Sequence, residues 1–125
     1  MTYQAPLADL RFMLHELVDF SAAVADPDMF NEELALTIYE EAGKFAAGVL
    51  EPLNALGDRA GLSLNEGVVT TPDGFADAWA QMCANGWNNM ALPEAYGGQN
   101  LPWMISSLAT EMFSSANKAF TMCPG

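Results

Sequence analysis

The side chains that could carry out chemistry in this chain are few, and their spacing fits no common catalytic or metal-binding motif. His15 is the only histidine, so a metal cluster or a serine–histidine pair would lack the imidazoles it needs. The two cysteines, Cys83 and Cys123, lack the spacing of a metal site or a disulfide framework. We therefore interpret His15 as a partly exposed structural residue and Cys83 as a buried, unreactive thiol.

Carboxylates are plentiful, but their positions indicate a solvated surface rather than an acid–base site. Glu111 differs from the others, because it stands between Leu108 and Met112 in a mostly apolar segment. Even there, a place on the helix surface or in a salt bridge is favoured over catalysis. Six further glutamates fall mostly opposite the apolar faces of the predicted helices: Glu32, Glu33, Glu40, Glu41, Glu51 and Glu94.

Composition and charge exclude several classes of partner. The 125 residues fit one domain, and a formal net charge of −12 with four Lys and Arg disfavours nucleic acid and anionic membranes. No apolar run approaches the ~20 residues of a spanning helix, so we expect no membrane insertion. The N-terminus resembles neither a secretory signal nor a transit peptide, which predicts a cytoplasmic protein with reduced thiols. Half of the chain is nevertheless hydrophobic (51%), and this surplus predicts self-association.

Periodicity predicts helices as the elements that position these side chains. Leu10, Met13, Leu14 and Leu17 mark one face of a first helix over residues 6–20. A second helix begins at Asn31, with Leu34, Ile38, Ala42, Phe45 and Val49 on its apolar face. We expect Pro52 to end or kink it near residue 51, with a loop over residues 57–61.

The second half of the chain predicts a short hairpin and two more helices. Asn65-Glu66-Gly67 is typical of a turn between two short strands, which we expect to lie against the helices. Thr71-Pro72 is expected to start a helix that buries Phe75, Ala78, Trp79 and Met82 and stops at Gly86. The last helix is expected to run from about residue 102 to residues 116–118. The sequence therefore predicts a mainly α chain, with helices in an antiparallel up-and-down arrangement and at most one short β-hairpin.

The stretch between the last two helices carries a family resemblance. Gly86-Trp87 is followed by Leu92-Pro93-Glu94-Ala95-Tyr96-Gly97-Gly98-Gln99, and then by a helix that contains Glu111. This succession resembles the N-terminal helical domain of the acyl-CoA dehydrogenases. Segments 50–54, 57–61, 71–75 and 116–120 agree, and residues 3–20 resemble the extension of a longer bacterial branch that includes enzymes of methylthio-substituted propionyl-CoA.

The resemblance implies a division of the chain and an activity for the whole protein. Residues 1–28 would be an N-terminal extension helix, and residues 29–125 a partial helical domain that is cut short at its C-terminal end. The intact enzyme would use FAD to dehydrogenate an acyl-CoA thioester and pass the electrons to an electron-transfer acceptor. Its catalytic Glu and nearly all flavin contacts come later in the chain, so we assign no catalytic, cofactor-binding or metal residue here and expect this part alone to be inactive.

By the same resemblance, the segment after the last helix lines the far end of the acyl pocket. This places Ala119, Phe120, Cys123 and Pro124 at the pocket wall, and the bulk of Phe120 suggests a short or branched acyl group. An equally weighted interpretation makes Phe120 an ordinary core residue. The alternative for the whole chain is a free-standing acidic helical module that binds a partner protein and has no enzymatic activity.

Overall fold

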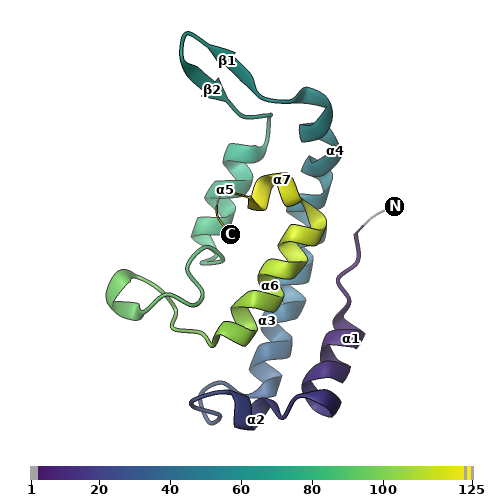
Figure 1. Cartoon of the computed structure of the whole chain (residues 1–125), viewed down its shortest axis with the longest axis vertical. Helices are drawn as coiled ribbons and strands as arrows, with labels where there is room; N and C mark the ends of the chain where they lie inside the picture. The colour runs from purple at the N-terminus through teal and green to yellow at the C-terminus, as the bar shows by residue number, and fades with distance from the viewer. Residues whose placement is uncertain (1–2, 123, 125) are drawn as a thin grey trace.

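The computed structural model describes residues 3–122 and 124, and it is mainly helical. Its longest feature is a continuous rod made of α3 (Glu32–Phe45), the π turn η2 (Ala46–Leu50) and α4 (Glu51–Ala60). The helices α5 (Phe75–Ala84) and α6 (Trp103–Ala116) accompany this rod (Figure 1). The helices α1, α3–α4, α5 and α6 run in alternating directions, which confirms the predicted mainly α, up-and-down fold class.

The rod starts where the sequence predicts and ends later. Asn31 caps α3, because its side-chain oxygen accepts a hydrogen bond from the Leu34 N–H at 2.9 Å. The helix does not end at Pro52, which corrects one form of the prediction: Pro52 lies in the first turn of α4, directly after the π turn. A proline is tolerated there because the first turn of a helix does not need its N–H. The predicted loop over residues 57–61 is helical up to Ala60, and Gly61 ends it with a φ of +67°.

The N-terminal segment is interrupted where one helix was predicted. Helix α1 (Leu7–Phe12) passes into the π turn η1 (Met13–Leu17), and a short helix α2 (Phe20–Ala23) follows. Val18 is extended between them, and the Asp19 carboxylate starts α2 by accepting a hydrogen bond from the Ala22 N–H. Leu14 of the predicted apolar face is buried, whereas Leu17 is 69% exposed because the chain turns away there.

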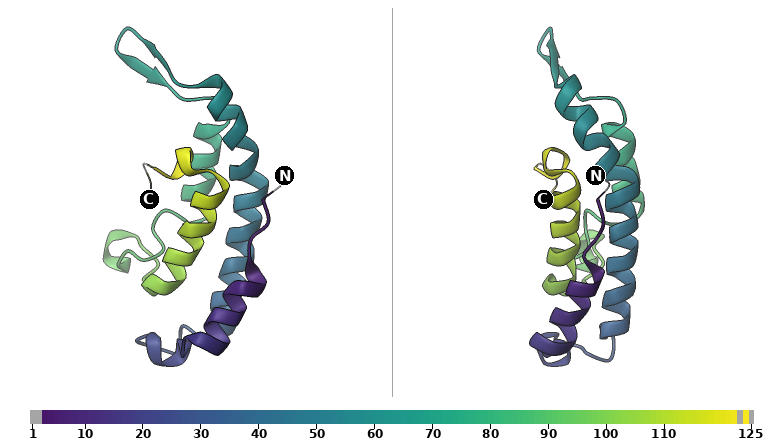
Figure 2. Two further views of the ribbon diagram at one scale, coloured as in Figure 1. Left: turned by 45° about the vertical axis from the view of Figure 1, so that its right-hand side comes forward. Right: turned by 90° about the vertical axis from the view of Figure 1, so that its right-hand side faces the viewer.

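The hairpin forms as predicted but lies elsewhere than predicted. Strands β1 (Ser63–Asn65) and β2 (Val68–Thr70) pair antiparallel around a turn in which Glu66 and Gly67 have φ values of +50° and +82°. Both values are positive, as a two-residue hairpin turn requires. The expectation that the strands lie against the helices is wrong, because both strands are fully exposed and project beyond the rod (Figure 2).

Helix α5 starts later than expected and buries a narrower face. Gly74, with a φ of +87°, precedes the first turn at Phe75, so the predicted start at Thr71-Pro72 is three residues early. Ala78 and Met82 are buried, but Trp79 is 43% exposed. Cys83 is exposed, which corrects the prediction of a buried thiol. Its Cβ points about 100° around the helix from that of Met82, and only the Met82 side faces the core.

The core lies between α3 and α6. Tyr39 and Leu50 of the rod meet Ile105, Met112 and Phe113 of α6, and all five side chains are at most 2% exposed. The predicted face of the second helix is confirmed at Ala42 and Phe45, which are buried. It is wrong at Leu34, which is 37% exposed, while Ala35 and Tyr39 are buried in its place. After α6 the chain turns at Asn117 into the short helix α7 (Lys118–Thr121).

Candidate functional site

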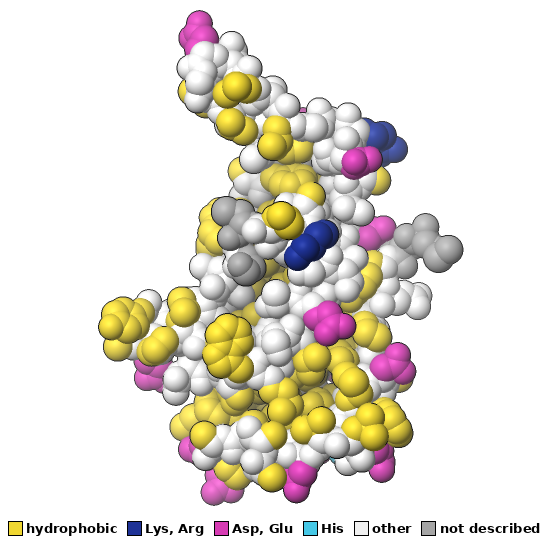
Figure 3. All heavy atoms as spheres, viewed as in Figure 1, with side chains coloured by type: hydrophobic (Ala, Val, Ile, Leu, Met, Phe, Trp, Pro, Cys, Tyr) yellow, Lys and Arg dark blue, Asp and Glu magenta, His cyan; other side chains and the backbone are white. Residues whose placement is uncertain are grey.

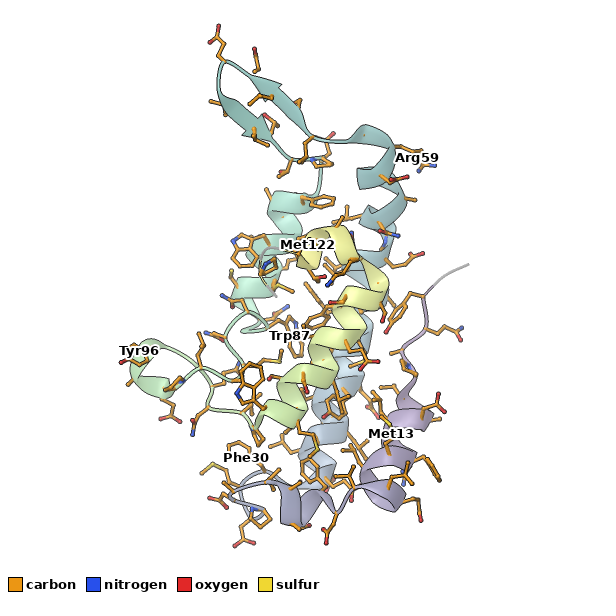
Figure 4. All side chains as sticks on the ribbon, in the orientation of Figure 1. Met13, Phe30, Arg59, Trp87, Tyr96 and Met122 are labelled. Carbon is orange, nitrogen blue, oxygen red and sulfur yellow. The ribbon has the colours of Figure 1, made fainter. Side chains whose placement is uncertain are left out.

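The loop that carries the family-like motif is held by its own polar side chains. The Asn89 amide donates to the Gly97 carbonyl at 2.7 Å, and the Gln99 amide donates to the Gly86 carbonyl at 2.6 Å. The short 3₁₀ helix η3 (Glu94–Tyr96) lies within the loop, and Tyr96 points away from the body at its tip (Figure 4). The polar side chains of the motif therefore hold the loop closed; they do not form a cluster that could carry out chemistry.

The backbone of the loop explains why both Gly97 and Gly98 are glycines. Gly97 adopts a φ of +79°, which disfavours a side chain. A Cβ on Gly98 would lie 1.9 Å from the Leu92 carbonyl oxygen, so the backbone could not pass there with any other residue. The Gly97-Gly98 pair is thus required by the loop itself, and no phosphate or other ligand is needed to explain it.

A hollow of about 700 Å³ lies between this loop and α3. Trp87 lies in its wall and packs against Phe113 and Phe45, with ring centroids 5.5 and 6.3 Å away. The cation of the hollow, Lys44, pairs with Glu41 at 2.6 Å, and this contact raises the pKa of the lysine. The wall of the hollow therefore combines apolar side chains with one paired lysine and glutamate.

The structure does not gather the predicted wall residues into one cavity. Phe120 is 8% exposed, and its ring centroid lies 5.7 Å from that of Phe75. Ala119 is exposed and lines a hollow of about 500 Å³ beside Phe75. Pro124 is half-buried and lines a different, small cavity of about 20 Å³. Cys123 lies outside the described residues.

Sequence reasoning missed the residue that organises this end of the molecule, Asn117. Its side chain is 1% exposed and makes two hydrogen bonds. The amide oxygen accepts from the Phe120 N–H at 3.0 Å, and the amide nitrogen donates to the Leu50 carbonyl at 3.0 Å. The sequence did contain a signal for this role. Asn117 stands near the predicted end of the last helix and shortly before Phe120, and an asparagine in such a place is typical of the N-cap of a further helix.

The remaining candidates are structural in this chain. His15 is partly exposed as predicted, and its Nδ1 lies 2.7 Å from a Glu32 carboxylate oxygen, which joins η1 to the start of α3. Glu111 is exposed on α6, as the surface interpretation requires. Burial, and to a smaller extent the nearby charge of Glu111, raises the pKa of Tyr3. The His15–Glu32 contact holds two segments of the chain together, and Glu111 lies on the surface, so each of these residues has a structural explanation.

Neither a metal nor a dinucleotide fits the described residues. Within residues 3–122 and 124, no cluster of three or more His, Cys, Asp or Glu side chains could hold a metal ion. FAD carries a pyrophosphate, which needs positive charge or converging backbone N–H groups. The only positively charged side chain among the described residues that line the hollow of about 700 Å³ is Lys44, and it is already paired with Glu41. The residues present therefore do not fit FAD. In the same part of the chain, no helix is both long and apolar enough to span a bilayer.

Comparisons with known proteins identify the family. Over 126 aligned residues, which cover 99% of this chain, the sequence is 35% identical to 3-methylmercaptopropionyl-CoA dehydrogenase from Ruegeria pomeroyi. The chain spans 21% of the length of that relative. Residues 31–125 match the family model described as acyl-CoA dehydrogenase, N-terminal domain. The chain therefore belongs to the acyl-CoA dehydrogenase family.

Proposed function

We propose that this chain is the N-terminal part of an FAD-dependent dehydrogenase that introduces an α,β double bond into an acyl-CoA thioester. The observation that carries the proposal is the 35% identity over 99% of the chain to a relative named as an acyl-CoA dehydrogenase. The bound flavin would supply the hydride acceptor. Since the residues present do not fit that flavin, the chain's own contribution is to shape the protein around the acyl group.

Within that protein, residues 29–125 form a partial helical domain and residues 1–28 an extension. Their exposed apolar side chains support packing on further parts of the protein or on a second copy. Leu64 is 72% exposed, Trp103 78% and Tyr96 83%. Figure 3 shows apolar side chains gathered on the hairpin and at the opposite end of the molecule, while Lys and Arg side chains are sparse. The proposal includes a cytoplasmic location and an electron-transfer acceptor.

The finer proposal is that Ala119, Phe120, Cys123 and Pro124 wall the acyl end of the substrate pocket. Phe120 supports it by its size and its place on a short helix held to the core by Asn117. A bulky wall restricts the length of the acyl chain, so the substrate would be short or branched.

A pair of phenylalanine variants tests this wall in the full-length enzyme. Phe120→Ala is expected to shift kcat/KM from butanoyl-CoA toward octanoyl-CoA by about tenfold, because the wall recedes. Phe45→Ala is the matched control, since Phe45 is equally buried at 6% exposure but lies in the cluster around Trp87. If both variants lose activity without any change in chain-length preference, Phe120 is a core residue and the wall assignment is wrong.

The wider proposal is tested by reading the coding DNA beyond the codon for Gly125. An open frame that continues with the Thr-Glu and Gly-Ser-Asp signature of the middle domain would support a dehydrogenase. A stop codon there would favour the free-standing helical module and contradict the proposal for the whole protein.

A further inference from the structure

Asn117 is a polar side chain enclosed at the meeting point of α6, α7 and the rod. It is one of the largest fully buried side chains among the described residues, and the others of that group are apolar or aromatic. A buried amide costs stability unless its donor and acceptor are both used. Both are used here, and both bonds run to backbone groups, so the amide fixes the path of the chain rather than the position of another side chain.

The two bonds join segments that are far apart in the sequence. The Leu50 carbonyl that accepts from Asn117 belongs to the last residue of the π turn, 67 positions away. The Phe120 N–H that donates to Asn117 lies in the first turn of α7. Such π turns occur frequently at functional sites, where they offset a helix from its regular path. Asn117 thus fixes the position of α7 relative to the π turn of the rod.

Helix α7 depends on these bonds for its geometry. It has four residues, and a helix of one turn is not stable without external contacts. Its other polar support is the Thr121 hydroxyl, which lies 3.2 Å from the Ser114 hydroxyl of α6. The remaining support is apolar: the Phe120 ring packs against Phe75 of α5, with the centroids 5.7 Å apart. Removing the Asn117 amide would therefore release the N-terminal end of α7 while α6 and the rod stay in place.

We propose that Asn117 is a positioning residue for acyl-chain specificity, which acts by holding Phe120 of α7 at a fixed place relative to Leu50 of the rod. This inference rests on the proposed function, because it treats Phe120 as the wall of the acyl pocket. Asn117 itself would touch no substrate. A wall that can shift admits longer acyl chains, so loss of Asn117 should change specificity in the same direction as truncation of Phe120.

The test compares three variants of the full-length enzyme. Asn117→Ala removes both bonds, and Asn117→Ser keeps an N-cap oxygen for the Phe120 N–H but cannot reach the Leu50 carbonyl. Tyr39→Phe is the matched control, because it removes one partly buried side-chain hydrogen bond, from the Tyr39 hydroxyl to the Met104 carbonyl at 3.2 Å, at the other end of α6. The measurements are kcat and KM for butanoyl-CoA and octanoyl-CoA, and hydrogen exchange of the Phe120 amide.

We expect Asn117→Ala to lower the butanoyl to octanoyl ratio of kcat/KM by about tenfold and Asn117→Ser by about threefold, mainly through KM. The Phe120 amide should exchange faster in Asn117→Ala, and Tyr39→Phe should leave both readouts unchanged. If the wild type is active but Asn117→Ala and Asn117→Ser keep its ratio, or change it no more than Tyr39→Phe does, the inference is wrong while the proposed function stands. A full-length wild type that oxidises neither thioester, even with flavin bound, would overturn both.

Discussion

The junction of η2, α6 and α7 and the hairpin of β1 and β2 use similar apolar residues in opposite ways. At the junction, Leu50 is completely buried, and the Asn117 side chain donates one hydrogen bond and accepts another. On the hairpin, Leu64 and Val69 face each other across the strands but are 72% and 58% exposed. An isolated two-stranded hairpin is marginal in water. The comparison shows that apolar content alone does not locate the core of this chain.

The largest expected effect separates these two regions directly. Leu50→Ala should lower the free energy of unfolding by about 3 kcal/mol, because it removes a fully enclosed side chain and leaves a cavity. Leu64→Ala should change it by less than about 0.5 kcal/mol, since a side chain in solvent has few contacts to lose. Urea unfolding of both variants, followed by circular dichroism, measures the difference. Equal losses would mean that the hairpin is packed in solution and that the contrast is wrong.

Substitutions at two glycines sharpen the comparison, because they test whether a position has room for a side chain, whereas the leucine variants test burial. Gly98→Ala should cost about 2 kcal/mol or more, because the new Cβ would lie 1.9 Å from the Leu92 carbonyl oxygen. Gly48→Ala should stabilise the chain by about 0.5 kcal/mol, since no atom lies within 4 Å of its added Cβ and the residue is helical. Thermal unfolding of the two variants is the measurement. A neutral Gly98→Ala would contradict the described path of the loop.

A smaller effect is expected from Tyr39, the polar group on the buried side of α3. Tyr39→Phe should cost about 1 kcal/mol, because the Met104 carbonyl loses its phenolic donor. Burial raises the pKa of Tyr39 above its ordinary value. Its contribution is therefore complete below about pH 10 and is lost as the pH rises beyond that, since the unfolded phenol ionises first.

Unfolding measured between neutral and strongly alkaline pH should thus show a steeper alkaline loss in the wild type than in Tyr39→Phe. Some loss remains in the variant, because the pKa of Tyr3 is raised as well. Parallel curves for the two proteins would indicate that the Tyr39 phenol is not enclosed as described.

The sequence predicted what depends on local signals. The Asn31 cap, the positive-φ turn at Gly67 and the stop at Gly86 follow from the chemistry of single residues, and the structure has all three. The continuation of the rod through Pro52 was not predictable in this way. It depends on the π turn before Pro52, which places the proline in the first turn of α4. The same holds for Asn117, whose partner Leu50 lies 67 positions away.

The site was less predictable than the fold. The family resemblance rests on residues that build a loop, such as Gly98, and the structure explains them by a backbone contact. The exposure of Cys83 and Trp79 depends on which side of α5 meets the core, and that choice is made by packing across the molecule. Periodicity gives the width of a buried face only approximately, so neighbours of a buried residue are easily misassigned.

The most direct test of the central claim is an anaerobic titration of the purified full-length protein with short acyl-CoA thioesters. If this chain is the N-terminal part of an acyl-CoA dehydrogenase, the protein should carry flavin, and its visible absorbance should bleach as the thioester is converted to the enoyl-CoA. Loss of absorbance should be greater with a short acyl group than with a long one. A flavin-loaded protein that keeps its absorbance with every acyl-CoA offered would contradict the account.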